Sequence, residues 1–130
     1  MTKWIAVSLA TMALFSLILS GCTSTSKANT DPAQAINTAV NQEFTIALGS
    51  NITTGYSWQP QYDTNTFTLV GREYKANDTT GKLIVGAPGT EYFHFKASKT
   101  GNAKIKFTYY RPWETPKAED KTAEFNVVVK

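Results

Sequence analysis

The chain has 130 residues with 13 basic and 10 acidic side chains, a formal net charge of +3 and a single histidine. The basic residues are dispersed, and no nucleic-acid motif accompanies them, so we expect no nucleic acid as a partner. With one histidine, one cysteine and no acidic pair in an apolar setting, the sequence offers no basis for a zinc site, a catalytic triad or paired-carboxylate hydrolysis. We therefore expect a protein that is not an enzyme and that holds neither a metal nor another cofactor.

The N-terminal segment is typical of an exported lipoprotein. Lys3 supplies one positive charge, residues 4–19 are uncharged and mostly apolar, and the sequence Leu-Ser-Gly-Cys at 19–22 resembles the bacterial lipobox, whose cysteine is acylated after cleavage. Residues 1–21 are therefore predicted to be a lipoprotein signal peptide, and Cys22 the lipidated membrane anchor. An uncleaved signal anchor is the alternative.

The residue after the cysteine bears on the compartment. Thr23 stands where an aspartate would resemble the inner-membrane retention signal, so we expect lipid anchoring in the outer membrane of a bacterial cell envelope. Cys22 is the only cysteine, so the remainder of the chain has neither a disulfide nor a thiol nucleophile.

Removal of the first 21 of the 130 residues leaves 109, which is enough for one domain with a hydrophobic core but too few for two. Residues 22–41 are rich in Ser, Thr, Asn and Ala and carry almost no large apolar side chain, so they are predicted to form a flexible tether. Residues 42–130 are predicted to form one monomeric domain.

The apolar residues of this domain recur with a period of two, which is typical of half-buried strands. The alternating sets are Phe44, Ile46 and Leu48; Tyr56 and Trp58; Phe67 and Leu69; Phe93 and Phe95; Ala103, Ile105, Phe107 and Tyr109; and Phe125, Val127 and Val129. No stretch after residue 42 sustains a helical period, so the pattern predicts an all-β, immunoglobulin-like antiparallel β-sandwich. Trp58 is expected in its core.

The order of the predicted strands places three loops at one end of the sandwich. Residues 91–97 and 103–110 are joined by five residues, a length that suits a hairpin, so residues 86–90 and 111–118 should lie side by side. The chain that leaves residues 51–54 is expected to return through residues 82–85, which brings the first loop to the same end.

The residues of these loops suit a surface that grips another protein. Residues 51–58 combine hydroxyls and aromatic rings with a glycine that permits a turn, and residues 111–114 combine Arg, Trp and Glu with a rigid Pro.

The three loops also resemble a known family. The sequences Asn-Ile-Thr-Thr-Gly-Tyr at 51–56, Gly-Ala-Pro-Gly at 86–89 and Arg-Pro-Trp at 111–113 are similar to the three loop motifs of the chagasin family of cysteine-peptidase inhibitors, in the same order and with similar spacing. The resemblance covers residues 41–130. Ile52 stands where the family usually has Pro, so the first loop lacks the fixed φ angle of a proline at this position. Pro88 stands where Gly is common.

This resemblance implies a reversible, tight-binding inhibitor of papain-like cysteine peptidases, whose three loops straddle the active-site cleft without covalent chemistry. The implied peptidase-binding residues are Asn51, Thr53, Thr54, Gly55, Tyr56, Gly86, Ala87, Pro88, Gly89, Arg111, Pro112 and Trp113.

The resemblance also implies roles for single residues. Thr53 and Thr54 would lie near the catalytic Cys and His of the peptidase, since a small β-branched hydroxyl side chain fits a narrow slot. Gly86 and Gly89 would let the backbone approach the enzyme, although an ordinary Gly-Pro turn is the alternative.

In the third loop, Trp113 would be an amphipathic anchor on the partner, and Arg111 would fork onto a carboxylate or carbonyl there. The alternative is that Trp113 folds back onto the sandwich as a lid.

Two other functions stay open at this point. One is an envelope module that binds glycan on an aromatic platform of Tyr92, Tyr110 and Trp113, and the other is an accessory lipoprotein that docks on an outer-membrane protein machine. A glycan site predicts aromatic residues spread along a strand face, whereas an inhibitor predicts them at the loop end. His94 is expected to be a surface residue.

Overall fold

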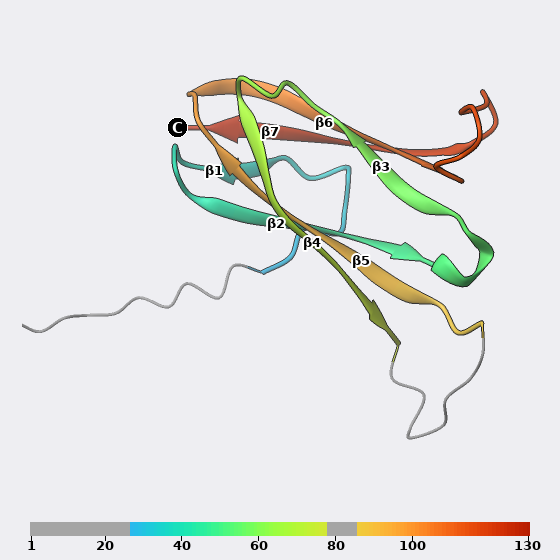
Figure 1. Cartoon of the computed structure of the whole chain (residues 1–130). Helices are drawn as coiled ribbons and strands as arrows, with labels where there is room; N and C mark the ends of the chain where they lie inside the picture. The colour runs from blue at the N-terminus through green and yellow to red at the C-terminus, as the bar shows by residue number, and fades with distance from the viewer. Residues whose placement is uncertain (1–26, 78–85) are drawn as a thin grey trace, which may run out of the picture.

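The computed structural model describes residues 27–77 and 86–130, which form a two-layer β-sandwich (Figure 1). One sheet has the strand order β1-β7-β6-β3 and the other has the order β2-β5-β4. All pairs are antiparallel except β1 with β7. The predicted all-β, immunoglobulin-like sandwich is confirmed. The elements are β1 (Ile36–Thr38), β2 (Glu43–Ser50), the 3₁₀ turn η1 (Ile52–Thr54), β3 (Ser57–Gln61), β4 (Phe67–Ala76), β5 (Gly89–Ala97), β6 (Gly101–Tyr110) and β7 (Lys121–Val129).

The core lies between the two sheets and is built from the inward-facing residues of the alternating pattern. Phe93 and Phe95 of β5 meet Phe107 of β6 across the layer, with ring centroids 4.8 and 6.3 Å apart, and all three are fully buried. Burial of each such side chain contributes about 1.5–3 kcal/mol. Trp58 is 7% exposed, which confirms its predicted place in the core.

The sandwich begins earlier in the chain than the sequence predicts, so the boundary of the tether at residue 41 is wrong. Ile36 of β1 is 3% exposed and pairs with Val127. Upstream of it, the backbone N–H of Asn29 donates to the carbonyl of Thr45, and its carbonyl accepts from Ala47 N–H, at 2.8 and 2.9 Å. The segment is held largely by backbone hydrogen bonds, which leave little trace in an apolar pattern. Residues 1–26, with the predicted signal peptide and Cys22, lie outside the described residues.

The predicted hairpin between residues 91–97 and 103–110 is also wrong, because β5 and β6 lie in different sheets. The connection at 98–100 crosses from one layer to the other and still reverses the chain, so the consequence for the loops is unchanged. The return from the first loop runs through β4, whereas residues 82–85 lie outside the described residues.

The loop after β2, the loop before β5 and the loop after β6 gather at the right-hand end in Figure 1, while the C-terminus lies at the opposite end. Within residues 27–77 and 86–130, no helix has the length and the apolar character needed to cross a membrane.

Candidate functional site

The first loop, residues 51–56, is a compact 3₁₀ turn organised by Asn51. The side-chain Oδ1 of Asn51 accepts hydrogen bonds from the backbone N–H and the hydroxyl of Thr53, at 3.3 and 2.5 Å. Its backbone carbonyl accepts the hydroxyl of Thr54 at 2.7 Å. Gly55 ends the turn at φ +82°, a left-handed conformation that favours glycine. Both threonine hydroxyls therefore donate within the loop.

The sequence predicts that Ile52, in place of the family's proline, leaves this loop less rigid. In the structure the cap formed by Asn51 and the closing bond from Gly55 N–H to the Ile52 carbonyl, at 3.0 Å, define the turn. Ile52 itself is 43% exposed and adds an apolar side chain to the loop surface.

Hydrogen bonds join the three loops into one surface, which we call the loop edge (residues 51–56, 86–88 and 111–114). The side-chain amide of Asn51 donates to the carbonyl of Gly86 at 3.0 Å, and Nε of Arg111 donates to the carbonyl of Thr54 at 3.2 Å. The guanidinium of Arg111 also lies 4.8 Å from the centre of the Tyr56 ring. The predicted convergence of the three loops is confirmed.

Arg111 is therefore engaged within the free protein. Its Nη1 lies 3.5 Å from Oε1 of Glu114, and the backbone N–H of Glu114 closes a turn onto the Arg111 carbonyl at 2.9 Å. The expected fork of Arg111 onto a partner's carboxylate competes with these contacts, so the structure favours a role in joining the first and third loops.

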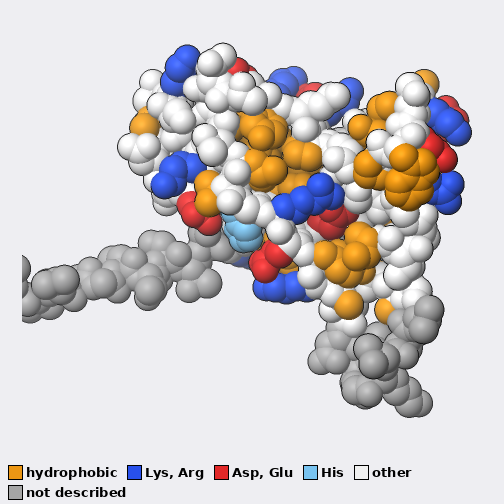
Figure 2. Space-filling view, viewed as in Figure 1, with side chains coloured by type: hydrophobic (Ala, Val, Ile, Leu, Met, Phe, Trp, Pro, Cys, Tyr) orange, Lys and Arg blue, Asp and Glu red, His pale blue; other side chains and the backbone are white. Residues whose placement is uncertain are grey.

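Trp113 is the most exposed of the large hydrophobic side chains in the described residues, at 71%. It rests on the first loop, where a Cβ atom on Gly55 would stand 2.5 Å from its Cη2. It does not fold onto the sandwich as a lid, so that alternative is wrong. In Figure 2, hydrophobic side chains form patches at the end of the molecule that carries the three loops and also in the middle of the visible face.

The second loop divides into an exposed part and a buried part. Residues 86–88 are exposed or partly exposed, and Gly86 has φ +85°. Gly89 is buried at the start of β5, where a Cβ atom would collide with the carbonyl oxygen of Lys75 and the ring of Tyr74. The expectation that Gly89 brings its backbone to a partner does not fit this position, since its small size serves packing between strands.

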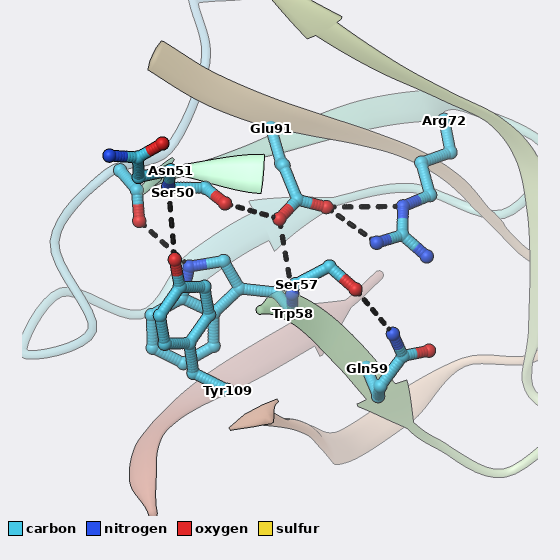
Figure 3. A network of polar contacts seen from close by, with 9 residues as sticks. Ser50, Asn51, Ser57, Trp58, Gln59, Arg72, Glu91 and Tyr109 are labelled. Carbon is cyan, nitrogen blue, oxygen red and sulfur yellow. Dashed lines mark hydrogen bonds and ion pairs between the residues drawn. The ribbon is translucent and has the colours of Figure 1, made fainter. Parts of the chain in front are cut away.

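Sequence reasoning did not identify the polar residues beneath the loop edge. Glu91, Arg72, Ser50 and Tyr109 form hydrogen bonds at the bases of the loops (Figure 3). A signal for Glu91 was present, because it occupies the inward register of Phe93 and Phe95, where a charged side chain is unusual.

The three aromatic residues expected to form a glycan-binding platform do not lie on one face of the protein. Tyr92 lies on β5 and Tyr110 on β6, which belong to different sheets, while Trp113 projects from a loop. His94 is 27% exposed, with Nδ1 2.8 Å from the hydroxyl of Thr45, and lies in β5, away from the loop edge. The arrangement favours binding at the loop end.

Together, the sandwich and its loop edge define a β-sandwich protein that presents one surface built from three hydrogen-bonded loops. Residues 37–129 match the family described as Chagasin family peptidase inhibitor I42, so the chain belongs to the chagasin family of peptidase inhibitors and is not an enzyme.

Known proteins similar to the chain agree with this assignment. It is 32% identical over 95 residues to Amoebiasin-2 of Entamoeba histolytica, an alignment that covers 73% of this chain and 76% of that protein. It is 31% identical over 87 residues to Chagasin of Trypanosoma cruzi, with 62% and 76% covered. Its fold is similar to the crystal structure of the cysteine protease inhibitor EhICP2 from Entamoeba histolytica, with a TM-score of 0.64, 31% identity, and coverage of 79% of this chain and 94% of the other.

Proposed function

We propose that this chain is a reversible, tight-binding inhibitor of papain-like cysteine peptidases and that it blocks the active-site cleft with its loop edge. Membership of the chagasin family supports the inhibitory function. One observation carries the proposed site: three family motifs, distant in sequence, are joined by the Asn51–Gly86 and Arg111–Thr54 hydrogen bonds into one surface.

The shape of the first loop explains inhibition without cleavage. A peptidase attacks a backbone carbonyl that is held in a near-attack geometry. Residues 52–54 are instead held in a 3₁₀ turn by Asn51 and Gly55, so the backbone that reaches the catalytic cysteine is curved and fixed. Because the loop is ordered before binding, little conformational entropy is lost on docking.

The exposed ring of Trp113 supplies the apolar anchor beside this loop. Aromatic anchors of this kind dominate the free energy of many interfaces, and its support on Gly55 fixes its position relative to Thr53 and Thr54. The loop edge therefore offers a narrow polar turn for the cleft and a flat apolar side chain for the cleft wall.

Titration of papain with the fragment 27–130 tests the proposal, because this fragment retains Asn29 and every strand of the sandwich. We expect complete, reversible inhibition at a stoichiometry of one, while trypsin and thermolysin stay fully active. Full papain activity at micromolar concentrations of the folded fragment would contradict the proposal.

We also propose that the protein is exported and lipid-anchored through Cys22, in the outer membrane of a bacterial envelope. The lipobox-like sequence at 19–22 supports this. The contact of Asn29 with Ile46 is parallel, so the chain before Asn29 leads toward the start of β2, away from the first loop at its end. Six residues separate Cys22 from Asn29, and this chain spans at most roughly 25 Å. The anchor would then hold the domain close to the bilayer with its loop edge pointing away.

A further inference from the structure

Glu91 is a buried carboxylate at the start of β5, with 2% of its side chain exposed. Its Oε1 accepts hydrogen bonds from the hydroxyl of Ser50 at 2.7 Å and from the backbone N–H of Trp58 at 3.1 Å. Its Oε2 accepts from Nη2 and Nε of Arg72, at 2.5 and 3.2 Å (Figure 3). A buried charge is tolerated only when it is fully paired in this way.

The two groups that donate to Oε1 lie on the strand ends on either side of the first loop, which we call its stems. Ser50 is the last residue of β2 and directly precedes residues 51–56, and Trp58, the second residue of β3, follows them after Ser57. Strand β2 belongs to the three-stranded sheet and β3 to the four-stranded sheet, so no strand pairing joins the two stems. The carboxylate of Glu91 bridges them instead.

Two further hydrogen bonds cross between the sheets at the same place. The indole Nε1 of Trp58 donates to the carbonyl of Gly49 at 2.8 Å, and the backbone N–H of Asn51 donates to the hydroxyl of Tyr109 at 3.0 Å. The first joins the two stems directly, from β3 to β2, and the second fixes the end of β2 against β6. Glu91 adds a single carboxylate that accepts a hydrogen bond from each stem. Through its hydrogen bonds with Arg72, Glu91 also links the two stems to strand β4.

We propose that Glu91 is a positioning residue for peptidase binding: it sets the spacing and direction of the two stems and thereby holds the first loop in its binding conformation, without touching the peptidase. The inference rests on the proposed inhibition of papain-like peptidases. Since the fraction of molecules in the competent conformation scales the apparent affinity, loosening the stems weakens binding even when every contact residue is present.

The test compares the fragment 27–130 carrying Glu91→Gln with Val127→Ala. Glutamine keeps the size of the side chain but removes the charge that Arg72 requires. Val127 is fully buried in β7 and pairs with Ile36 and Ala103, away from the loop edge, so its truncation lowers stability without acting on the stems. Thermal melts of both variants serve to verify that they are folded at the assay temperature.

For Glu91→Gln we expect at least a tenfold rise in the dissociation constant for papain, carried mainly by slower association, while Val127→Ala binds like the parent. Equal binding by parent and Glu91→Gln, or equal weakening by both variants, overturns the positioning role.

Amide hydrogen exchange of the free proteins gives a readout that does not depend on papain. Amides of residues 51–56 are expected to exchange at least tenfold faster in Glu91→Gln than in Val127→Ala under the same conditions. If the parent fails to inhibit papain but the loop still loosens, the proposed function is wrong and the positioning of the loop stands. Unchanged loop exchange in Glu91→Gln refutes the positioning.

Discussion

Trp113 lies directly over Gly55, so closely that a Cβ atom on residue 55 would stand 2.5 Å from Cη2 of the indole. Gly55 also has φ +82°, a conformation in which a residue with an L side chain is strained. The exposed anchor of the third loop therefore depends on the turn that ends the first loop. The two loops act as one unit, although more than 50 residues separate them in the sequence.

Gly55→Ala should consequently damage binding through both loops. The methyl group displaces the indole, and the left-handed backbone adds roughly 1–2 kcal/mol of strain. We expect at least a tenfold weaker inhibition of papain with a melting temperature lowered by only a few degrees. Gly49→Ala is the matched control, because a Cβ there has no atom within 4 Å and the position lacks positive φ. Inhibition unchanged in both variants would show that Trp113 does not rely on Gly55.

Trp113→Ala tests the anchor itself. Truncation of a central aromatic residue costs about 2–4 kcal/mol at interfaces, which corresponds to about a 30- to 1,000-fold rise in the dissociation constant. The fold should survive, since the side chain is 71% exposed. Lys104→Ala is the control, because Lys104 lies in β6 and pairs with Glu124 at 2.9 Å on the surface. Equal effects of the two changes would move the binding surface onto the sheet.

Arg111→Met tests the link between the first and third loops. Methionine keeps an apolar stem over Tyr56 but loses the hydrogen bond to the Thr54 carbonyl and the charge above the ring. We expect inhibition to weaken by about 1.5–3 kcal/mol, the range for a hydrogen bond that involves a charged group. Glu114→Gln removes only the partner at 3.5 Å and should change inhibition little. A larger loss with Glu114→Gln than with Arg111→Met would show that the ion pair, and not the loop link, matters.

The strands were predictable wherever one face of the sheet packs against the hydrophobic core and the other face is exposed to solvent. Phe93, Phe95, Ile105 and Phe107 alternate with polar residues because a period of two separates the faces. The convergence of the loops was predictable as well, because it depends only on chain reversal.

The pairing of strands was not predictable from the same pattern. A connection of five residues permits either a hairpin within one sheet or a crossing between two, and periodicity does not name the partner strand. Strand β1 was missed because its three residues carry one large apolar side chain, Ile36, and the rest of its stability comes from backbone hydrogen bonds.

Details of the site were predictable only in part. The residue types of the three loops indicated their place, but not that Arg111 and the threonine hydroxyls bind within the protein. These contacts depend on distances between loops that are far apart in the sequence. Only the unusual inward position of Glu91 hinted at the network below.

Thr53 can now be tested for two separate roles, order within the loop and fit in the cleft. Its hydroxyl donates to Asn51, so Thr53→Val, which keeps the β-branched shape, should weaken inhibition by about 1 kcal/mol through loss of that bond. Thr53→Ala should lose about the same. Thr53→Arg should be far worse, because a long charged side chain clashes in a narrow cleft. Inhibition constants against papain measure the effects of all three changes. Parent-like inhibition by Thr53→Arg would show that residue 53 does not enter the active-site cleft of the peptidase.

The anchor is tested with the full chain, expressed in a double-membraned bacterium. Cys22→Ala should abolish acylation and remove mature-sized protein from the membrane fraction, because Cys22 is the only thiol in the chain. Metabolic labelling with a fatty acid and fractionation measure both effects. Purified Cys22→Ala protein should inhibit papain like the fragment 27–130, since the chain before Asn29 leads away from the loop edge. For the same reason, the acylated parent protein in phospholipid vesicles should inhibit soluble papain with an unchanged inhibition constant. A loss of inhibition on the vesicle surface would show that the anchor turns the loop edge toward the bilayer.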